Sequence, residues 1–283
     1  MTLAQPIIAR TFAFHLIGPL TITGFGIAVL CAFFMAQYVC EQELIRRGQV
    51  EEAKAMGDVT FGALIGTLLG GKLYFVTVIT HNWHDLLSRS GFVFWGGFMG
   101  SVLCCWLVIR WRKLPFLNFA DVAGIAIAAG YAIGRTGCWA VGDDYGKYWR
   151  GPLAVAFPEG SPPSTAANMV REFGQRFDTP MDPSVVVTVI PTQLVEVALG
   201  FVMFLIAWRF RKHNHLAGWL FGLYCVLAGT ERFIVEFMRA KDDRFGLPLG
   251  LSTAQAIAIA IFVTGVVIMQ VRRRPEAASQ LAS

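Results

Sequence analysis

The sequence contains few charged residues. Asp, Glu, Lys and Arg make up 15% of its 283 residues, whereas soluble domains carry about 25%. Hydrophobic residues make up 55% of the chain, and the mean hydropathy is +0.55. A soluble protein of this length would need more charge to cover its surface. The composition therefore argues against an ordinary soluble domain and favours an integral membrane protein.

Cysteine patterns typical of metal sites and disulfide frameworks are also missing. None of the six cysteines forms a Cys-x-x-Cys pair, and most lie within apolar runs, where cysteine usually behaves as a small apolar residue. We therefore expect no metal and no cofactor. The net charge of +5 does not indicate nucleic-acid binding, because the basic residues are divided among several loops. We also expect no cleavable signal peptide, since the first apolar run is too long.

Long apolar runs are what the sequence does have. A transmembrane helix needs about 20 mostly apolar residues. Seven runs approach this length, and the fourth and fifth are short unless each tolerates its internal charge. We predict an all-α integral membrane protein with seven transmembrane helices in a single domain, residues 1–283. The predicted helices are Leu16–Cys40, Val59–Thr80, Gly91–Ile109, Val122–Gly142, Thr192–Trp208, Leu216–Met238 and Phe245–Val271.

Basic residues predict the orientation, because cytoplasmic loops of membrane proteins are enriched in Lys and Arg. Twelve of the 24 Lys and Arg residues follow predicted helices one, three, five and seven, whereas the opposite short ends hold Arg10 and Arg89. The N-terminus should therefore face the periplasm and the C-terminus the cytoplasm of a bacterial inner membrane. The long loop 143–190, between helices four and five, should be a periplasmic insertion. Its six prolines predict irregular structure, with one short helix near Ala166–Phe177.

Polar residues within the predicted helices lie at or above mid-depth on the periplasmic side. A charge at mid-bilayer costs about 2.5–3.5 kcal/mol, so these residues should face one another or a wet cavity. With Arg239 the group is cationic, which predicts a pocket for the phosphate of an anionic lipid headgroup. Alternatively, the charges on helix six could only neutralise one another across a helical turn. The residues are Lys72, Arg135, Gln193, Glu196, Glu231, Arg232 and Glu236.

Several motifs resemble the prolipoprotein diacylglyceryl transferase family. They are Gly-Arg-Thr-Gly-Cys-Trp at 134–139 followed by Gly-Asp-Asp-Tyr-Gly at 142–146, Pro-Thr-Gln-Leu-Val-Glu at 191–196, and Arg-Phe-Ile-Val-Glu-Phe-Met-Arg at 232–239. Weaker matches are Gly18-Pro19-Leu20, Gly-Lys-Leu-Tyr at 71–74 and Gly-Gly-Phe-Met-Gly at 96–100. The motifs keep the family's order and span nearly the whole chain.

The resemblance implies a seven-helix fold with the N-terminus outside. It implies transfer of diacylglyceryl from phosphatidylglycerol to the lipobox cysteine in a prolipoprotein signal peptide, with release of glycerol-1-phosphate. The essential arginines of the family fall on Arg135 and Arg232, and the last glycine of its signature falls on Gly146. Further candidates for lipid binding, besides Arg135 and Gly146, are Lys72, Gly96, Gly97, Gln193 and Arg239.

Other candidate residues should support these. Residues 142–146 form what we call the signature loop, and Asp143 should anchor it, either to an arginine or as a plain loop cap. Glu196 should brace an arginine or orient the lipid headgroup. The full supporting set is Trp95, Cys138, Asp143, Glu196 and Glu236. We expect phosphatidylglycerol and a prolipoprotein as partners, no nucleic acid, and a monomer.

Four sites depart from the family pattern. Trp95 replaces the histidine before Gly-Gly, Cys138 the signature asparagine, Ile190 the histidine before the Pro-Thr-Gln motif, and Gly24-Phe25-Gly26 a Trp-Tyr-Gly. Because an indole nitrogen only donates, Trp95 cannot serve as a base. A non-catalytic protein that binds anionic lipid, or a transferase with another acceptor, therefore remains an alternative. Cys138, His81 and His84 remain alternative catalytic groups. A transporter is disfavoured, because paired broken helices are not evident.

The orientation can be tested with reporter fusions. Fusions at Lys113, Lys212 and Ser283 should report a cytoplasmic location, and fusions at Ser88 and Ser164 a periplasmic one. An inverted pattern would place the polar residues of the helices on the cytoplasmic side and remove the basis for a periplasmic site.

Overall fold

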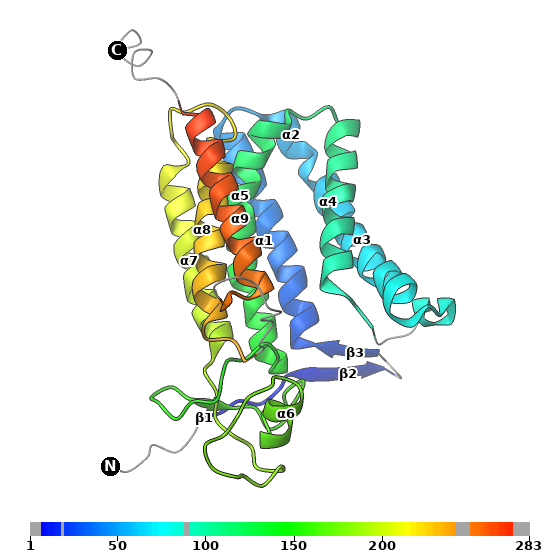
Figure 1. Ribbon diagram of the computed structural model, residues 1–283. Helices are drawn as coiled ribbons and strands as arrows, with labels where there is room; N and C mark the ends of the chain where they lie inside the picture. Colours follow the sequence, from blue (N-terminus) through cyan, green and yellow to red (C-terminus); the bar gives the residue numbers. More distant parts are fainter. Residues whose placement is uncertain (1–6, 18–19, 88–90, 241–249, 274–283) are drawn as a thin grey trace. The chain divides into compact units, whose positions relative to one another are not determined.

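The computed structural model describes residues 7–17, 20–87, 91–240 and 250–273 (Figure 1). These residues are mostly helical, which confirms the prediction of an all-α membrane protein. The chain divides into two compact units. Unit 1 comprises Met1–Ala32 and Ile127–Ser283, and unit 2 comprises Phe33–Ala126.

Six helical segments of the described chain are long and apolar enough to cross a membrane. The sixth predicted span corresponds to α8, Trp219–Glu236, which is not among these six. Three charged residues near its C-terminal end, Glu231, Arg232 and Glu236, lower its hydropathy. The number seven therefore stays a prediction. The six segments are α1 (Gly24–Arg46), Val50–Thr80, α4 (Phe94–Trp111), α5 (Phe116–Val141), α7 (Thr192–Phe210) and α9 (Thr253–Val271).

The first helix begins later than predicted. Strands β2 (Ala13–Ile17) and β3 (Leu20–Thr23) pair as an antiparallel hairpin where the predicted helix should start, and α1 begins at Gly24. A helix through this region would carry Pro19 in its interior, where proline removes a backbone hydrogen bond. The β-branched residues of β3 also favour a strand. The first part of the last predicted helix, 245–249, lies outside the described residues.

Unit 2 is built on close packing of α3 against α4. Its described part contains α2 (Val50–Lys54), α3 (Met56–Tyr74), the π-helix η1 (Phe75–Thr80), the 3-10 helix η2 (Trp83–Leu87) and α4. A Cβ on Gly66 would lie 2.3 Å from the carbonyl oxygen of Gly100, and one on Gly96 would lie 2.3 Å from that of Gly70. Glycines four residues apart on both helices thus bring the two backbones into contact, as in other membrane helix pairs.

In unit 1, glycines likewise allow the backbones of α8 and α9 to pack closely. A Cβ on Gly265 would lie 2.6 Å from the carbonyl oxygen of Gly222. The insertion between α5 and α7 holds strand β4 (Val155–Ala156), which pairs in parallel with β1 (Ile7–Ile8). It also holds α6 (Ala166–Arg171), shorter than the helix predicted there, followed at Gly174 by a left-handed residue with φ of +64°.

The insertion has a small apolar core of its own. Tyr145, Phe157 and Met169 are almost completely buried, and the rings of Tyr145 and Phe157 stack with their centroids 5.5 Å apart. Because Tyr145 belongs to the loop that follows α5, this core anchors that loop. Figure 1 shows the insertion at one end of the helices of unit 1, where α5 ends and α7 begins.

Candidate active site

Arg135 joins α5 to two carboxylates from other parts of unit 1. Its Nη1 lies 3.0 Å from Asp144 Oδ2, and its Nη2 pairs with Glu196 Oε2 on α7. The Glu196 side chain is only 2% exposed, whereas that of Asp144 is 40% exposed. Arg135 therefore connects a buried carboxylate on one side with a partly exposed one on the other.

A second arginine completes the group. Arg239, three residues beyond the end of α8, places Nη2 at 2.7 Å from Asp144 Oδ1 and Nη1 at 3.9 Å from Glu196 Oε1. Each carboxylate thus faces both guanidinium groups. We call these four residues, Arg135, Asp144, Glu196 and Arg239, the arginine–carboxylate cluster. Its two positive and two negative charges balance, which is how charged groups are accommodated within a membrane protein.

Two side chains of α7 hold the backbone of the signature loop in place. Thr192 Oγ1 donates a hydrogen bond of 2.7 Å to the carbonyl oxygen of Asp144, and Gln193 Nε2 donates one of 2.6 Å to that of Asp143. Asp144 itself has a positive φ of 54°, a conformation that aspartate tolerates better than most residues. The first turn of α7 therefore fixes the loop that carries Asp144.

Gly146 is required by packing. A Cβ at this position would lie 2.5 Å from the carbonyl oxygen of Met238 and 2.8 Å from the Cβ of Ile190. Its backbone N–H donates to the carbonyl oxygen of Ile190 at 2.8 Å, and the residue pairs with Arg239 in an isolated bridge. The signature loop can approach the segment after α8 this closely only with glycine here. A direct role of Gly146 in lipid binding stays a prediction.

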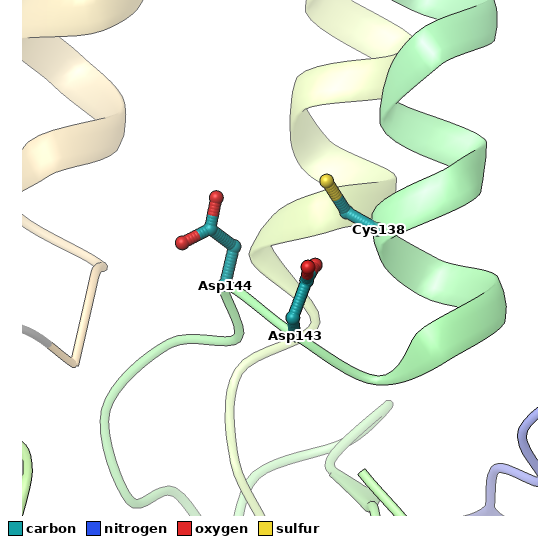
Figure 2. A group of neighbouring side chains, drawn as sticks. All are labelled: Cys138, Asp143 and Asp144. Atoms are coloured by element: carbon teal, nitrogen blue, oxygen red, sulfur yellow. The ribbon is translucent and has the colours of Figure 1, made fainter. Parts of the chain in front are cut away.

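Figure 2 shows Cys138, Asp143 and Asp144 around a common space, with Cys138 at the end of α5 and the two aspartates on the following loop. The sulfur and one oxygen from each carboxylate lie within 4.8 Å of one another. These are possible metal ligands, but Arg135 Nη1 already contacts two of them, donating to Cys138 Sγ at 3.3 Å and to Asp144. A guanidinium group therefore supplies the positive charge at this point.

The two aspartates differ in acidity. Burial raises the pKa of Asp143 from 3.8 to about 6, with a further contribution from the charge of Asp144, and Cys138, Arg135 and Arg239 oppose the shift. Burial acts on Asp144 in the same direction, but the charges of Arg239 and Arg135 outweigh it and hold the pKa of Asp144 below 3.8. Asp144 is therefore the permanent anion of the loop, and Asp143 is the carboxyl group that can exchange a proton near neutral pH.

Of the three charged residues at the end of α8, only two pair with each other. Arg232 Nη2 lies 2.8 Å from Glu236 Oε2, so these two form an i, i+4 ion pair. Glu231 instead contacts Tyr131 of α5, with 3.0 Å between its Oε1 and the phenol oxygen. The Arg232 side chain is 33% exposed, and its Nη1 is buried without a hydrogen-bond partner among the described residues.

The remaining predicted site residues belong to unit 2, and their contacts are given within that unit alone. Lys72 Nζ lies 5.9 Å from the ring centroid of Phe75. Trp95 is half-exposed, and its ring contacts are with Phe94 and Phe98 of its own helix. Packing explains Gly96 and Gly97 of α4. A Cβ on Gly96 would come too close to α3, and a Cβ on Gly97 would come too close to the ring of Phe92.

Two site residues escaped the sequence analysis. Asp144, and not Asp143, forms the ion pairs with arginine, so the expectation that Asp143 could anchor the loop to an arginine is corrected. The signal was ambiguous because the two residues are adjacent and identical. Tyr131 was missed because a search for charges passes over a phenol, although it lies four residues before Arg135 and hence one helical turn away.

The site residues described above lie within the part of the chain that matches known proteins. Residues 11–271 match the family described as prolipoprotein diacylglyceryl transferase. The chain belongs to this family. A relative from Paraburkholderia phymatum is 31% identical over 297 residues, which cover 95% of this chain and 96% of the relative. One from Xanthomonas euvesicatoria is 26% identical over 282 residues, with 91% and 90% covered.

A third relative, from Stenotrophomonas maltophilia, is 28% identical over 284 residues, again with 91% and 90% covered. All three are named phosphatidylglycerol–prolipoprotein diacylglyceryl transferase. The match to the family extends over both units, so the cluster of unit 1 and the glycine-packed helices of unit 2 belong to one diacylglyceryl transferase chain.

The acidity of Asp143 predicts a pH-dependent stability. Its pKa is raised on folding, so the stabilisation from its protonated form is complete below 3.8 and is lost as the pH rises through about 6. Asp143→Asn does not titrate. The free energy of unfolding of the variant should therefore rise relative to that of the wild type between pH 4 and pH 6. Above pH 6 the variant should keep this advantage, which amounts to at most about 3 kcal/mol.

Thermal unfolding in detergent across this pH range measures the difference. Asp182→Asn is the control, because Asp182 lies fully exposed in the same insertion and its pKa is lowered by hydrogen bonds from Ser184. The control should show no such gain. A constant difference between Asp143→Asn and wild type at every pH would contradict the assignment.

Proposed function

We propose that this chain transfers the diacylglyceryl group of phosphatidylglycerol to the lipobox cysteine of a prolipoprotein and releases glycerol-1-phosphate. The observation that carries the proposal is the arginine–carboxylate cluster, in which Arg135 and Arg239 converge within a chain of the diacylglyceryl transferase family. Two guanidinium groups at one point suit a phosphate, which they can hold through paired N–H donors.

The reaction requires charge to be stabilised on the leaving group. The thiol sulfur forms a bond to the glyceryl carbon, the bond from that carbon to the phosphate oxygen breaks, and its electron pair stays on the phosphate. Donors aimed at the developing charge are the main means of lowering such a barrier. We assign this role to Arg135 and Arg232. Arg135 Nε and Arg232 Nη1 support it, because both are buried without a hydrogen-bond partner among the described residues.

Asp144 is the group that the phosphate would displace. Both carboxylates of the cluster compete with a phosphate for the arginines, but the Glu196 side chain is 2% exposed and that of Asp144 is 40% exposed. The more exposed carboxylate can give way to an incoming anion at the lower cost. In this proposal the headgroup phosphate takes the place of Asp144 on Arg135 and Arg239. Lipid-binding roles that remain proposals on the family resemblance are those of Lys72, Gly96, Gly97, Gly146 and Gln193.

The proton of the substrate thiol must go to a base. Trp95 cannot accept it, because the indole nitrogen is only a donor. Asp143 is our candidate, since its pKa of about 6 leaves it ionised yet basic at neutral pH. Its Oδ1 is buried and has no hydrogen-bond partner among the described residues. Asp143 would then take the proton while Arg135 and Arg232 receive the phosphate charge.

The membrane arrangement is part of the proposal. At about 1.5 Å per residue, the 18 residues of α8 extend about 27 Å, close to the thickness of the hydrocarbon core. With α8 as a seventh span, the charge distribution puts the N-terminus and the insertion 143–190 in the periplasm. The protein would then be a multi-pass monomer of the bacterial inner membrane with its active site towards the periplasm.

One observation favours a second function. With Trp95 in place of the family histidine, the chain could bind anionic lipid through its arginines and carry out no transfer. Both functions predict binding of phosphatidylglycerol, so only a transfer assay separates them.

The assay follows labelled diacylglyceryl from phosphatidylglycerol to a lipobox peptide over a pH series. The wild-type rate should rise as the pH passes about 6, where Asp143 ionises, and should rise further towards the thiol pKa of about 8.5. Trp95→His should increase the neutral-pH rate, because a general base typically contributes about 10²–10⁴-fold.

Phe98→His is the matched control, because Phe98 is about as exposed as Trp95 and lies less than one turn further along α4. It should leave the rate unchanged. If wild type and Trp95→His both bind the lipid but transfer nothing at any pH, the chain is the non-catalytic lipid-binding protein.

A further inference from the structure

Tyr131 on α5 lies between two carboxylates from two other helices. Its phenol oxygen is 3.3 Å from Oε1 of Glu196 on α7 and 3.0 Å from Oε1 of Glu231 on α8. A phenol carries one hydrogen and can therefore donate to only one of these oxygens. The other contact needs a hydrogen from the carboxyl group itself, because two acceptors at this distance repel each other.

Glu196 is the ionised member of the pair. Its Oε2 pairs with Arg135, and its Oε1 lies 3.9 Å from Arg239 Nη1. With two guanidinium groups in reach, its negative charge is compensated. Glu196 therefore accepts the hydrogen of Tyr131.

Glu231 lacks such compensation. It is 6% exposed, and within the described part of the chain it forms no ion pair, since the neighbouring guanidinium of Arg232 is engaged with Glu236 at 2.8 Å. An isolated carboxylate buried in a membrane protein is costly, and the cost is avoided when the group keeps its proton. Two negative charges around a single phenol would also repel each other.

The groups around Glu231 agree with this assignment. Those facing it are Tyr131 and Arg135 of α5, Glu196 of α7, and Tyr224 and Arg232 of its own helix. Helix α9, which packs against α8 through Gly265, contains no titratable side chain. Both guanidinium groups near Glu231 are engaged elsewhere, Arg135 with Glu196 and Asp144, and Arg232 with Glu236.

We propose that Tyr131 and Glu231 are positioning residues for Glu196. Protonated Glu231 donates to the oxygen of Tyr131, and Tyr131 donates to Oε1 of Glu196. This directed chain fixes the rotation of the Glu196 carboxylate, so that Oε2 stays on Arg135. Glu196 then remains on the arginine when Asp144 is displaced. The consequence for catalysis rests on the proposed transferase function, whereas the location of the proton does not.

Infrared difference spectroscopy tests the location of the proton. The wild type at pH 8 should show the carbonyl band of a protonated carboxylic acid, and Glu231→Gln should remove it. At pH 8 Asp143, with a pKa of about 6, is ionised and does not contribute. Glu236→Gln is the control and should leave the band, because Glu236 is paired with Arg232. A spectrum in which Glu231→Gln removes no band overturns the proposal.

Transfer rates test the positioning role. Glutamine can donate the same hydrogen bond as protonated glutamate, so Glu231→Gln should retain most of the wild-type rate. Glu231→Met fills similar space without a donor and should lose about tenfold, the scale of one hydrogen bond. Tyr131→Phe should lose a similar factor.

Equal losses in Glu231→Gln and Glu231→Met would overturn the role, since the donated hydrogen would then be irrelevant. If the wild type transfers nothing, the transferase proposal fails, and the infrared result alone decides where the proton lies.

Discussion

The arginine–carboxylate cluster is the interaction on which the site depends. Arg135 and Asp144 come from α5 and the loop that follows it, whereas Glu196 and Arg239 come from α7 and the segment after α8, which are distant in sequence. Within a membrane protein each of these charges is tolerable only while the others compensate it. Removing one buried member would leave an unpaired charge, at a cost of about 3–5 kcal/mol. The cluster thus fixes three helix ends and the insertion relative to one another within unit 1.

The same constraint shapes the chemistry. In the balanced cluster both arginines are paired before the lipid binds. Because Asp144 is more exposed than Glu196, Asp144 is the carboxylate that the phosphate displaces, and Glu196 remains paired with Arg135. Tyr131 and Glu231 hold Glu196 in place through a hydrogen-bond chain that carries no net charge of its own. The pKa of Asp143 is higher because its carboxyl group is buried and lies next to the permanent anion Asp144, and the charges of Arg135 and Arg239 only partly oppose this shift.

Much of this architecture could be predicted from sequence. Apolar runs located six of the seven predicted spans, with α7 beginning at Thr192 as predicted, and the motifs singled out Arg135 and Glu196. Hydropathy could not separate the apolar hairpin β2–β3 from the start of α1, because strands and helices can be equally apolar. It also could not choose between Asp143 and Asp144, since the choice depends on the left-handed backbone at Asp144. Tyr131 carries no charge, so its role emerges only from distances.

The central claim is that phosphatidylglycerol binds by replacing Asp144 on the two arginines. The most direct measurement is the affinity for phosphatidylglycerol of the purified protein in nanodiscs of neutral lipid. Asp144→Asn removes the competing anion and should bind more tightly than wild type. Arg135→Ala should bind more weakly by about 1.5–3 kcal/mol, the scale of a charge-assisted contact. Opposite shifts in these two variants support the account, and an Asp144→Asn variant that binds no more tightly than wild type would contradict it.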